Sequence, residues 1–409
     1  MAETFTYRVR DRGGALVQGT LEGDSVSLVV ARLRELGYVP LSVDRKSTTG
    51  LQSEIRVPFL GGRVKADELA TFSRQFATMI ESGLTLLRAL AVLAEQTDSP
   101  RLAEVLNEVR LDIEAGSSLS QALSRRPKVF PRLYVAMIRA GEIGGGLDMV
   151  LLQLADTLEK QAGLRRKVKS AMTYPVAVLC LSVLILTAML LFVVPTFKKM
   201  FATLHGSLPT PTKILVDVSD HALIVIPAFL ISVGALTYGF RRWIETPTGR
   251  FMWDRFKLRA PVFGKLVHFI SIARTCRTLA ALTKAGVPLL EGLEITKTTS
   301  GNALVARALE DVQEGVSGGE AIARRLSNHP VIPTMVTQMI SVGEESGAVD
   351  TMLDKVASFY ESRVEAMVAS LTSLLEPVLI MVLGSVVGSM VIALYMPMFK
   401  IYSLPGLNG

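Results

Sequence analysis

The segment GEIGGGLD, residues 141–148, returns later in the chain as GEESGAVD, residues 343–350. Both copies have the pattern G-E-x-x-G-x-[LV]-D, and each is followed by a long apolar run. Glycine adopts positive φ without steric cost, so the glycines favour a tight turn between two helices. The duplicated turn therefore predicts two copies of one helical unit, each leading into an apolar helix.

The acids of these turns have two interpretations. In the first, Asp148 and Asp350 cap the helix that follows each turn. In the second, Glu142, Asp148, Glu344 and Asp350 present carboxylates to a partner protein or a cation, and they are candidate docking residues. Two carboxylates in each turn are too few for a calcium site, since calcium takes about 6–8 oxygen ligands. We therefore predict no metal site.

The turns belong to a longer internal repeat, which relates residues 65–170 to residues 241–375. Gly and Pro divide both copies into helix-length pieces, and apolar residues recur in them with helical periodicity. Each copy is expected to be an all-α bundle, which makes the chain mainly α. Matched pairs along the two copies include Arg74 with Arg277, Gly83 with Gly286, Leu90 with Leu293, Glu159 with Glu361 and Pro175 with Pro377.

Three apolar segments are predicted to be transmembrane helices: residues 171–197, 222–240 and 376–399. No charged residue lies between Lys169 and Lys198, which exceeds the roughly 20 apolar residues that a span needs. The first and third spans are expected to begin at the matched prolines. The second has a proline, Pro227, inside it.

The composition and the basic clusters indicate how the chain lies in a membrane. Hydrophobic residues make up 49% of the 409 residues, and the mean hydropathy is +0.39. Basic clusters at 160–169 and 241–265 adjoin apolar runs, as cytoplasmic flanks facing anionic lipid do. A nucleic-acid patch is the disfavoured alternative. We expect residues 65–170 and 241–375 in the cytoplasm, with the loop 198–221 and the tail 400–409 outside.

The first 45 residues predict a small α+β domain, and residues 46–64 a linker. Alternating apolar residues, a Gly-Gly turn and a short amphipathic stretch give the order ββαβ. The first residues contain no apolar signal segment, so this domain is expected in the cytoplasm. Residues 46–64 are rich in Ser, Thr and Gly, as linkers are.

The sequence lacks the motifs of catalysis. It contains no phosphate-binding loop, no nucleophile elbow and no zinc-protease helix, and its 4 histidines are scattered. Its 2 cysteines form no disulfide framework. We therefore expect no enzyme, no catalytic residues and no cofactor. A transporter is disfavoured because the predicted spans carry no ionisable residue, and a membrane sensor has no recognisable signalling motif.

Gly384 and Gly388 form a small-xxx-small pair in the third predicted span. Such pairs permit close approach of two helices. The two glycines are candidate packing residues, either against another part of the chain or in a homodimer.

With the duplicated turn, four further motifs carry a family resemblance: AMTYP at 171–175, VPTF at 194–197, LPTPT at 208–212 and LEP at 375–377. The chain resembles the inner-membrane platform proteins of type IV pili and type II secretion systems over nearly its whole length. One departure is Val349, where the usual pattern has Leu before the aspartate.

The resemblance implies a multi-pass protein of the bacterial inner membrane. Such platforms bind a cytoplasmic hexameric assembly ATPase, and a retraction ATPase where the filament retracts. They pass the motion of that ATPase to pilin or pseudopilin, contact other inner-membrane components and lipid, form homo-oligomers and bind no nucleic acid. Pilus assembly is the leading expectation, and a type II secretion platform is the alternative.

Overall fold

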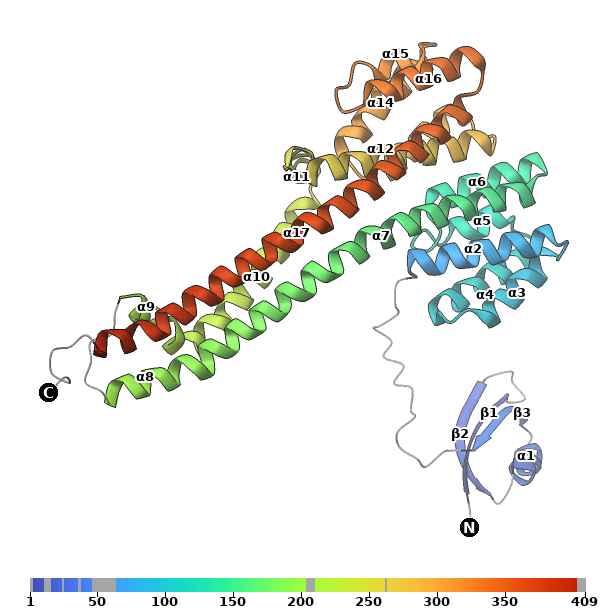
Figure 1. Cartoon of the computed structure of the whole chain (residues 1–409). Coiled ribbons are helices and arrows are strands. Elements are labelled where there is room, and N and C mark those ends of the chain that lie inside the picture. The colour runs from blue at the N-terminus through green and yellow to red at the C-terminus, as the bar shows by residue number, and fades with distance from the viewer. Residues whose placement is uncertain are drawn as a thin grey trace. The chain divides into compact units, whose positions relative to one another are not determined.

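The computed structural model describes residues 3–10, 16–23, 26–35, 38–45, 64–203, 210–261 and 263–402. It divides the chain into two units, residues 1–62 and 63–409. The predicted linker, apart from its last residue, and the tail beyond residue 402 lie outside the described residues, as do residues 204–209. The two units are described separately (Figure 1).

The N-terminal unit is a three-stranded antiparallel sheet with one helix. Its elements are β1 (Glu3–Arg10), β2 (Leu16–Gly23), α1 (Val26–Glu35) and β3 (Val39–Arg45). The strand order is β2-β1-β3, and Phe5 pairs with both Leu21 and Arg45. Val29 and Leu33, one turn apart on α1, are fully buried.

The second unit is entirely helical in its described parts and contains the repeat. Its first copy consists of α2 (Ala66–Glu81), α3 (Leu86–Gln96), α4 (Pro100–Glu114), α5 (Leu119–Ser124), α6 (Arg132–Gly144) and α7 (Leu147–Ala188). The second consists of α12 (Phe263–Lys284), α13 (Leu289–Thr299), α14 (Ala303–Ser317), α15 (Ile322–Leu326), α16 (Thr334–Ser346) and α17 (Val349–Tyr402). The expectation of a mainly α chain with two repeated helical domains is confirmed.

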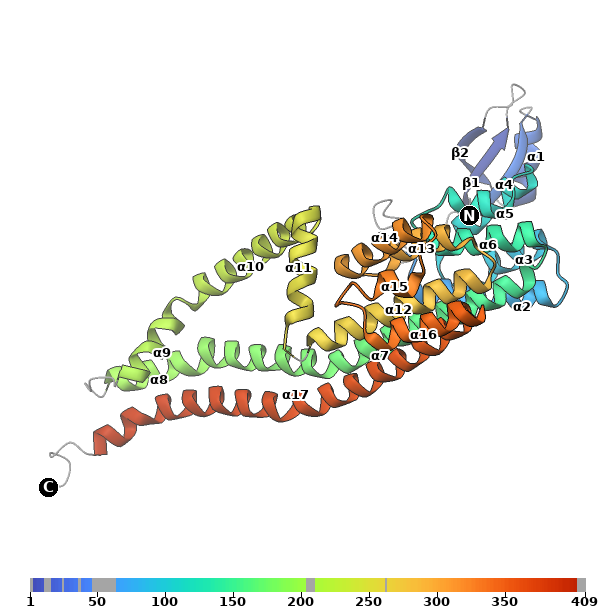
Figure 2. The same ribbon diagram turned by 90° about the horizontal axis from the view of Figure 1, so that it is seen from above.

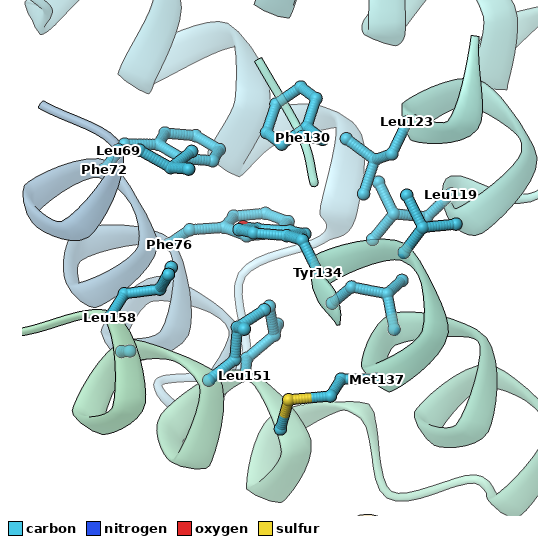
Figure 3. Packing of buried hydrophobic residues seen from close by; sticks show 14 of the residues in the cluster. Leu69, Phe72, Phe76, Leu119, Leu123, Phe130, Tyr134, Met137, Leu151 and Leu158 are labelled. Carbon is cyan, nitrogen blue, oxygen red and sulfur yellow. The ribbon is translucent and has the colours of Figure 1, made fainter. Parts of the chain in front are cut away.

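The core of the first copy is formed by aromatic and aliphatic residues that meet between its helices (Figure 3). Phe72 and Phe76 stack with ring centroids 5.5 Å apart, and Phe130 meets Tyr134 edge to face at 5.1 Å. The Tyr134 hydroxyl hydrogen-bonds to the Ser73 hydroxyl at 3.3 Å, so the one polar group among these rings has a partner. Four residues of the second copy complete this core: Ala281, Leu282, Val287 and Ile295.

The apolar ends of α7 and α17 are direct continuations of the bundles, and the two long helices lie side by side (Figures 1 and 2). The stretches Leu147–Lys199 and Val349–Met396 are each long and apolar enough to cross a membrane. The third predicted span, 222–240, lies in α10 (Ala222–Ile244) and stays a prediction.

The matched prolines are not helix starts, and where the spans begin within the long helices stays a prediction. Pro175 lies inside α7, and Pro377 lies inside α17. A proline removes one helical hydrogen bond, but neighbouring helices and backbone adjustments compensate for it in long apolar helices. Each bundle is therefore joined to its apolar segment by continuous helix rather than by a helix start.

The predicted loop 198–221 is largely helical in its described part. After α7, one turn of π-helix (Met189–Val193) leads into α8 (Val194–Thr203), and α9 (Thr210–Asp220) returns. The hydroxyl of Ser219 donates to the main-chain oxygen of Leu190 at 2.6 Å, which satisfies a carbonyl in the π-helical turn. The chain then continues through α10 and α11 (Pro247–Arg259) to the second copy.

Candidate functional site

The two copies of the G-E-x-x-G-x-[LV]-D segment, residues 141–148 and 343–350, are called the acidic turns below. The first glycine of each acidic turn permits two helices to touch. A Cβ on Gly141 would lie 3.1 Å from the Cβ of Val150 and 3.2 Å from the Cα of Leu147. A Cβ on Gly343 would lie 2.9 Å from the Cα of Val349. Both positions therefore hold the helix before the turn against the long helix after it, and any side chain there would separate the pair.

The glutamate of each turn caps a short helix elsewhere in its bundle. The main-chain N–H groups of Leu119 and Ser120 donate to the two carboxylate oxygens of Glu142 at 2.6 and 3.2 Å. In the second copy, the N–H groups of Ile322 and Ala323 donate to those of Glu344 at 2.6 and 2.9 Å. These donors lie in the first turn of α5 and α15, where N–H groups lack helical partners and the helix dipole favours an anion.

The glycine before each long helix makes the turn itself. Gly145 has φ +74° and Gly347 has φ +71°, in the left-handed region that favours glycine. The N-cap of α7 is Gly146, without a side-chain cap hydrogen bond, so the prediction that Asp148 caps α7 is wrong. Asp148 and Asp350 instead lie within the first turns of α7 and α17, where a negative charge is favourable.

The structure thus separates the four candidate docking acids into two kinds. Glu142 and Glu344 are half-buried and use both carboxylate oxygens within the chain. Asp148 is exposed, and Asp350 is half-buried with only a long contact, 3.5 Å, from the Thr351 hydroxyl. Among the described residues, no group of His, Cys, Asp and Glu is arranged to hold a metal ion.

A second repeated cluster, an arginine paired with carboxylates, was not predicted from the sequence, although its arginine and glutamate are among the matched pairs. The guanidinium of Arg74 on α2 donates two hydrogen bonds to Glu159 on α7, at 2.8 and 2.7 Å, and also contacts Asp156. The guanidinium of Arg277 on α12 does the same to Glu361 on α17, at 2.9 and 2.7 Å, and contacts Asp354. The sequence did contain a signal for this pairing, because an Arg and a Glu recur at the same positions of both repeats.

These two arginine–carboxylate clusters, called the arginine forks below, differ in their environment. The Arg277 side chain is 4% exposed, against 34% for Arg74. Arg277 also donates to the Ser358 hydroxyl at 2.9 Å, which leaves its buried charge well paired. In the first copy, the hydrogen bond from Arg74 holds the pKa of the Glu159 carboxyl below its usual range. Both forks fasten the first helix of a bundle to the long helix.

The two candidate packing glycines meet nothing within the described chain. A Cβ added to Gly384 or Gly388 has no other heavy atom of the described residues within 4 Å, apart from the local helix backbone. Packing against another described part of the chain is therefore not seen at these positions. They lie on the apolar half of α17, where the large exposed side chains are apolar.

Comparison with known proteins gives one family over both copies. The profile of "Type II secretion system (T2SS), protein F" matches residues 72–195 and again residues 275–397. The profile of "Type II secretion system protein F, N-terminal domain" matches residues 1–44. The two matches to one profile agree with the two structural copies.

Curated relatives are similar over nearly the full length. The type IV pilus assembly protein PilC of Thermus thermophilus is 44% identical over 399 residues, covering 97% of this chain and 98% of the relative. The protein of the same name in Myxococcus xanthus is 41% identical over 397 residues, covering 97% and 94%. A type II secretion system protein F of Pseudomonas aeruginosa is 34% identical over 408 residues, covering 98% and 99%.

Proposed function

This chain belongs to the type II secretion system protein F family, and from that premise we propose that it is the inner-membrane platform on which a type IV pilus is assembled. The observation that carries the proposal is the 44% identity, over nearly both full lengths, to a type IV pilus assembly protein. A platform of this kind performs no chemistry itself. It couples a cytoplasmic hexameric ATPase to the polymerisation or extraction of pilin.

The architecture supports coupling between cytoplasm and membrane. Each bundle continues without a break into an apolar helix, through α7 and through α17. The forks at Arg74 and Arg277 fasten the first helix of each bundle to that same long helix. A movement imposed on a bundle is therefore expected to move its membrane helix as one body.

The proposed arrangement in the inner membrane has three spans, with α10 as the second. The N-terminal unit and both bundles lie in the cytoplasm, and the chain ends outside. Lipid surrounds the spans, and the proposed partners are the assembly ATPase, a retraction ATPase where the filament retracts, pilin and the other inner-membrane components. Arg241 and Arg242 at the cytoplasmic end of α10 support this orientation.

Deletion of the gene in its own bacterium tests the proposal. Surface pili counted by electron microscopy should disappear in the deletion strain and return with the intact gene. The alternative, a type II secretion platform assembling a pseudopilus, is supported by the protein F relative of 34% identity. A deletion strain that keeps its pili but no longer exports proteins to the medium would favour the alternative.

We further propose that Asp148, which is exposed, and Asp350, which is half-buried but has only one long contact among the described residues, contribute to docking of the ATPase, because accessible carboxylates can pair with Arg or Lys and set specificity. Asp148→Lys combined with Asp350→Lys should reduce co-purification of the ATPase and the number of pili. Glu95→Lys with Glu314→Lys, two exposed acids on α3 and α14, is the matched control. Equal effects of the two double variants would contradict docking at the turns.

A further inference from the structure

A basic cavity of about 740 Å³ lies between α11, α12, α14 and the segment before α16. Its apolar wall includes Phe251, Leu258, Leu304 and Val331. Four cationic side chains also line it: Arg255, Arg259, Lys265 and Arg307. No Asp or Glu is among the described lining residues, so the cavity combines an apolar interior with an uncompensated positive charge.

The cations of this cavity have no acidic partner in the described chain, although acids lie nearby. Asp254 on α11 is buried, accepts the main-chain N–H of Ala303 at 2.8 Å and pairs with Lys257 at 2.6 Å. Asp311 on α14 pairs with His329 at 3.0 Å and with Arg325 at 3.4 Å. Neither acid pairs with any of the four lining cations, and all four side chains are exposed, so they are available to an anion from outside.

The cavity is held in shape by specific contacts. Asp254 caps the first turn of α14 and thereby fixes α11 against it. Gly264, which lines the cavity, permits the tight passage from α11 to α12, because a Cβ there would lie 2.4 Å from the main-chain oxygen of Leu258. Figure 2 shows α11 turning away from the end of α10 and running to the beginning of α12.

The cavity lies beside the point where the apolar segments of α7 and α17 begin. Leu266 on α12, one residue after the lining Lys265, is buried against Val368 and Leu371 of α17, and Ala171 of α7 packs on the same cluster. The charge-free segment of α7 begins immediately before that alanine, after Lys169. The lining residues at the start of α12 therefore lie at the depth expected for a membrane surface.

The helix beside the cavity has the composition of an interfacial helix. Met252 and Phe256 of α11 are 61% and 62% exposed, and Trp243 at the end of α10 is 42% exposed. Aromatic side chains of this kind concentrate at the headgroup level of a bilayer. Large apolar side chains and unpaired cations on adjacent faces match a ligand that has both an acyl chain and a charged headgroup.

We propose that this cavity binds the phosphate-bearing headgroup of an anionic phospholipid from the cytoplasmic leaflet. Arg255 and Arg307 would contact the phosphate oxygens, since a guanidinium matches the geometry of a phosphate, while an acyl chain follows the apolar wall. This inference goes beyond pilus assembly. It depends on the cytoplasmic placement of α11, which reporter fusions test separately.

The protein's 2 tryptophans make the test direct, because Trp253 lies on α11. The full chain with Trp243→Phe is purified in detergent and titrated with phosphatidylglycerol or phosphatidylcholine carrying brominated acyl chains, which quench nearby tryptophan. Half-maximal quenching should require on the order of tenfold less phosphatidylglycerol than phosphatidylcholine, since each cation near such a headgroup contributes on the order of 1 kcal/mol.

Two double variants distinguish this site from general surface charge. Arg255→Gln with Arg307→Gln should remove most of the preference for phosphatidylglycerol, with Arg259 and Lys265 still in place. Arg250→Gln with Arg324→Gln removes the same charge from exposed positions that do not line the cavity, and should leave the preference unchanged. Lys265→Gln alone, which leaves both arginines in place, should reduce the preference partially and serves if the first double variant does not fold.

Free phosphate is the other source of the same chemistry. Glycerol 3-phosphate and inorganic phosphate, added at matched ionic strength, should not displace the brominated phosphatidylglycerol, because they lack the acyl chain. Displacement by either at the concentration of the lipid would show a soluble phosphate site and overturn the lipid assignment. Equal quenching by the two lipids, or loss of the preference in both double variants, would overturn it as well.

Discussion

Single residues of the acidic turn have separate physical roles. Gly141 allows α6 to touch α7, Gly145 provides the left-handed turn, and Glu142 reaches out of the turn to cap α5. The sequence predicted the turn and its left-handed glycine, but not the close helix contact at Gly141. It could not give the partner of Glu142, because Leu119 is distant along the chain and no local pattern links them. The same limit applies to Arg74 and Glu159, which were matched between copies but not paired.

The capping role of Glu142 gives a local prediction. Glu142→Gln replaces one carboxylate oxygen by an amide that cannot accept, and it removes a charge from a helix N-terminus. We expect a loss of about 1–2 kcal/mol in local stability. Amide hydrogen exchange at Leu119 and Ser120 should become faster. Asp148→Asn is the matched control, and comparable exchange at these two amides in both variants would contradict the capping role.

The two arginine forks should differ in their effect on stability. Arg277→Ala leaves Glu361 without its buried partner, so we expect the second copy to lose about 3 kcal/mol. Arg74→Ala removes a more exposed pair, and the expected loss is about 1 kcal/mol. Thermal unfolding of the purified chain in detergent compares the two. An equal decrease in melting temperature would mean that burial does not decide their contribution.

At the scale of elements, the long helices show what hydropathy can and cannot locate. The charge-free segments of α7 and α17 are evident in the sequence, and two helices of sufficient length contain them. The helices themselves begin well before these segments, because an apolar run indicates where lipid begins and not where a helix begins. Proline suits the first turn of a helix, yet Pro175 lies inside α7, because an interior proline is equally compatible with a long apolar helix.

The glycine pair of α17 gives a prediction about association of whole spans. Gly384 and Gly388 meet no other described part of the chain, so we expect them to allow close approach of a second copy. Gly384→Leu with Gly388→Leu should reduce the fraction of dimer measured by cross-linking in detergent, without affecting membrane insertion. Val382→Leu with Val386→Leu places leucines at the same spacing on the opposite face of the helix. An unchanged dimer fraction in the glycine variant would assign these positions to lipid contact.

At the scale of the molecule, the sidedness of the chain is the prediction that most constrains its function. A reporter active only outside the cytoplasm should be active when fused in the segment 204–209 or after Gly409. The same reporter after Arg259 should be inactive, since the basic flanks around α10 favour the cytoplasm. Activity at the segment 204–209 without activity after Gly409 would show that α17 does not cross the membrane.

The completion of the first core by residues of the second copy has a consequence for synthesis. Ala281, Leu282, Val287 and Ile295 are buried in that core, yet they are translated well after α7 is complete. At about 5–20 residues per second, the ribosome needs roughly 5–20 s to reach them. During that interval the first bundle is already anchored by its apolar helix but has part of its apolar surface uncovered. The nascent chain is therefore most vulnerable to aggregation and proteolysis between its two halves, and the second copy acts on the first as a late, built-in folding partner.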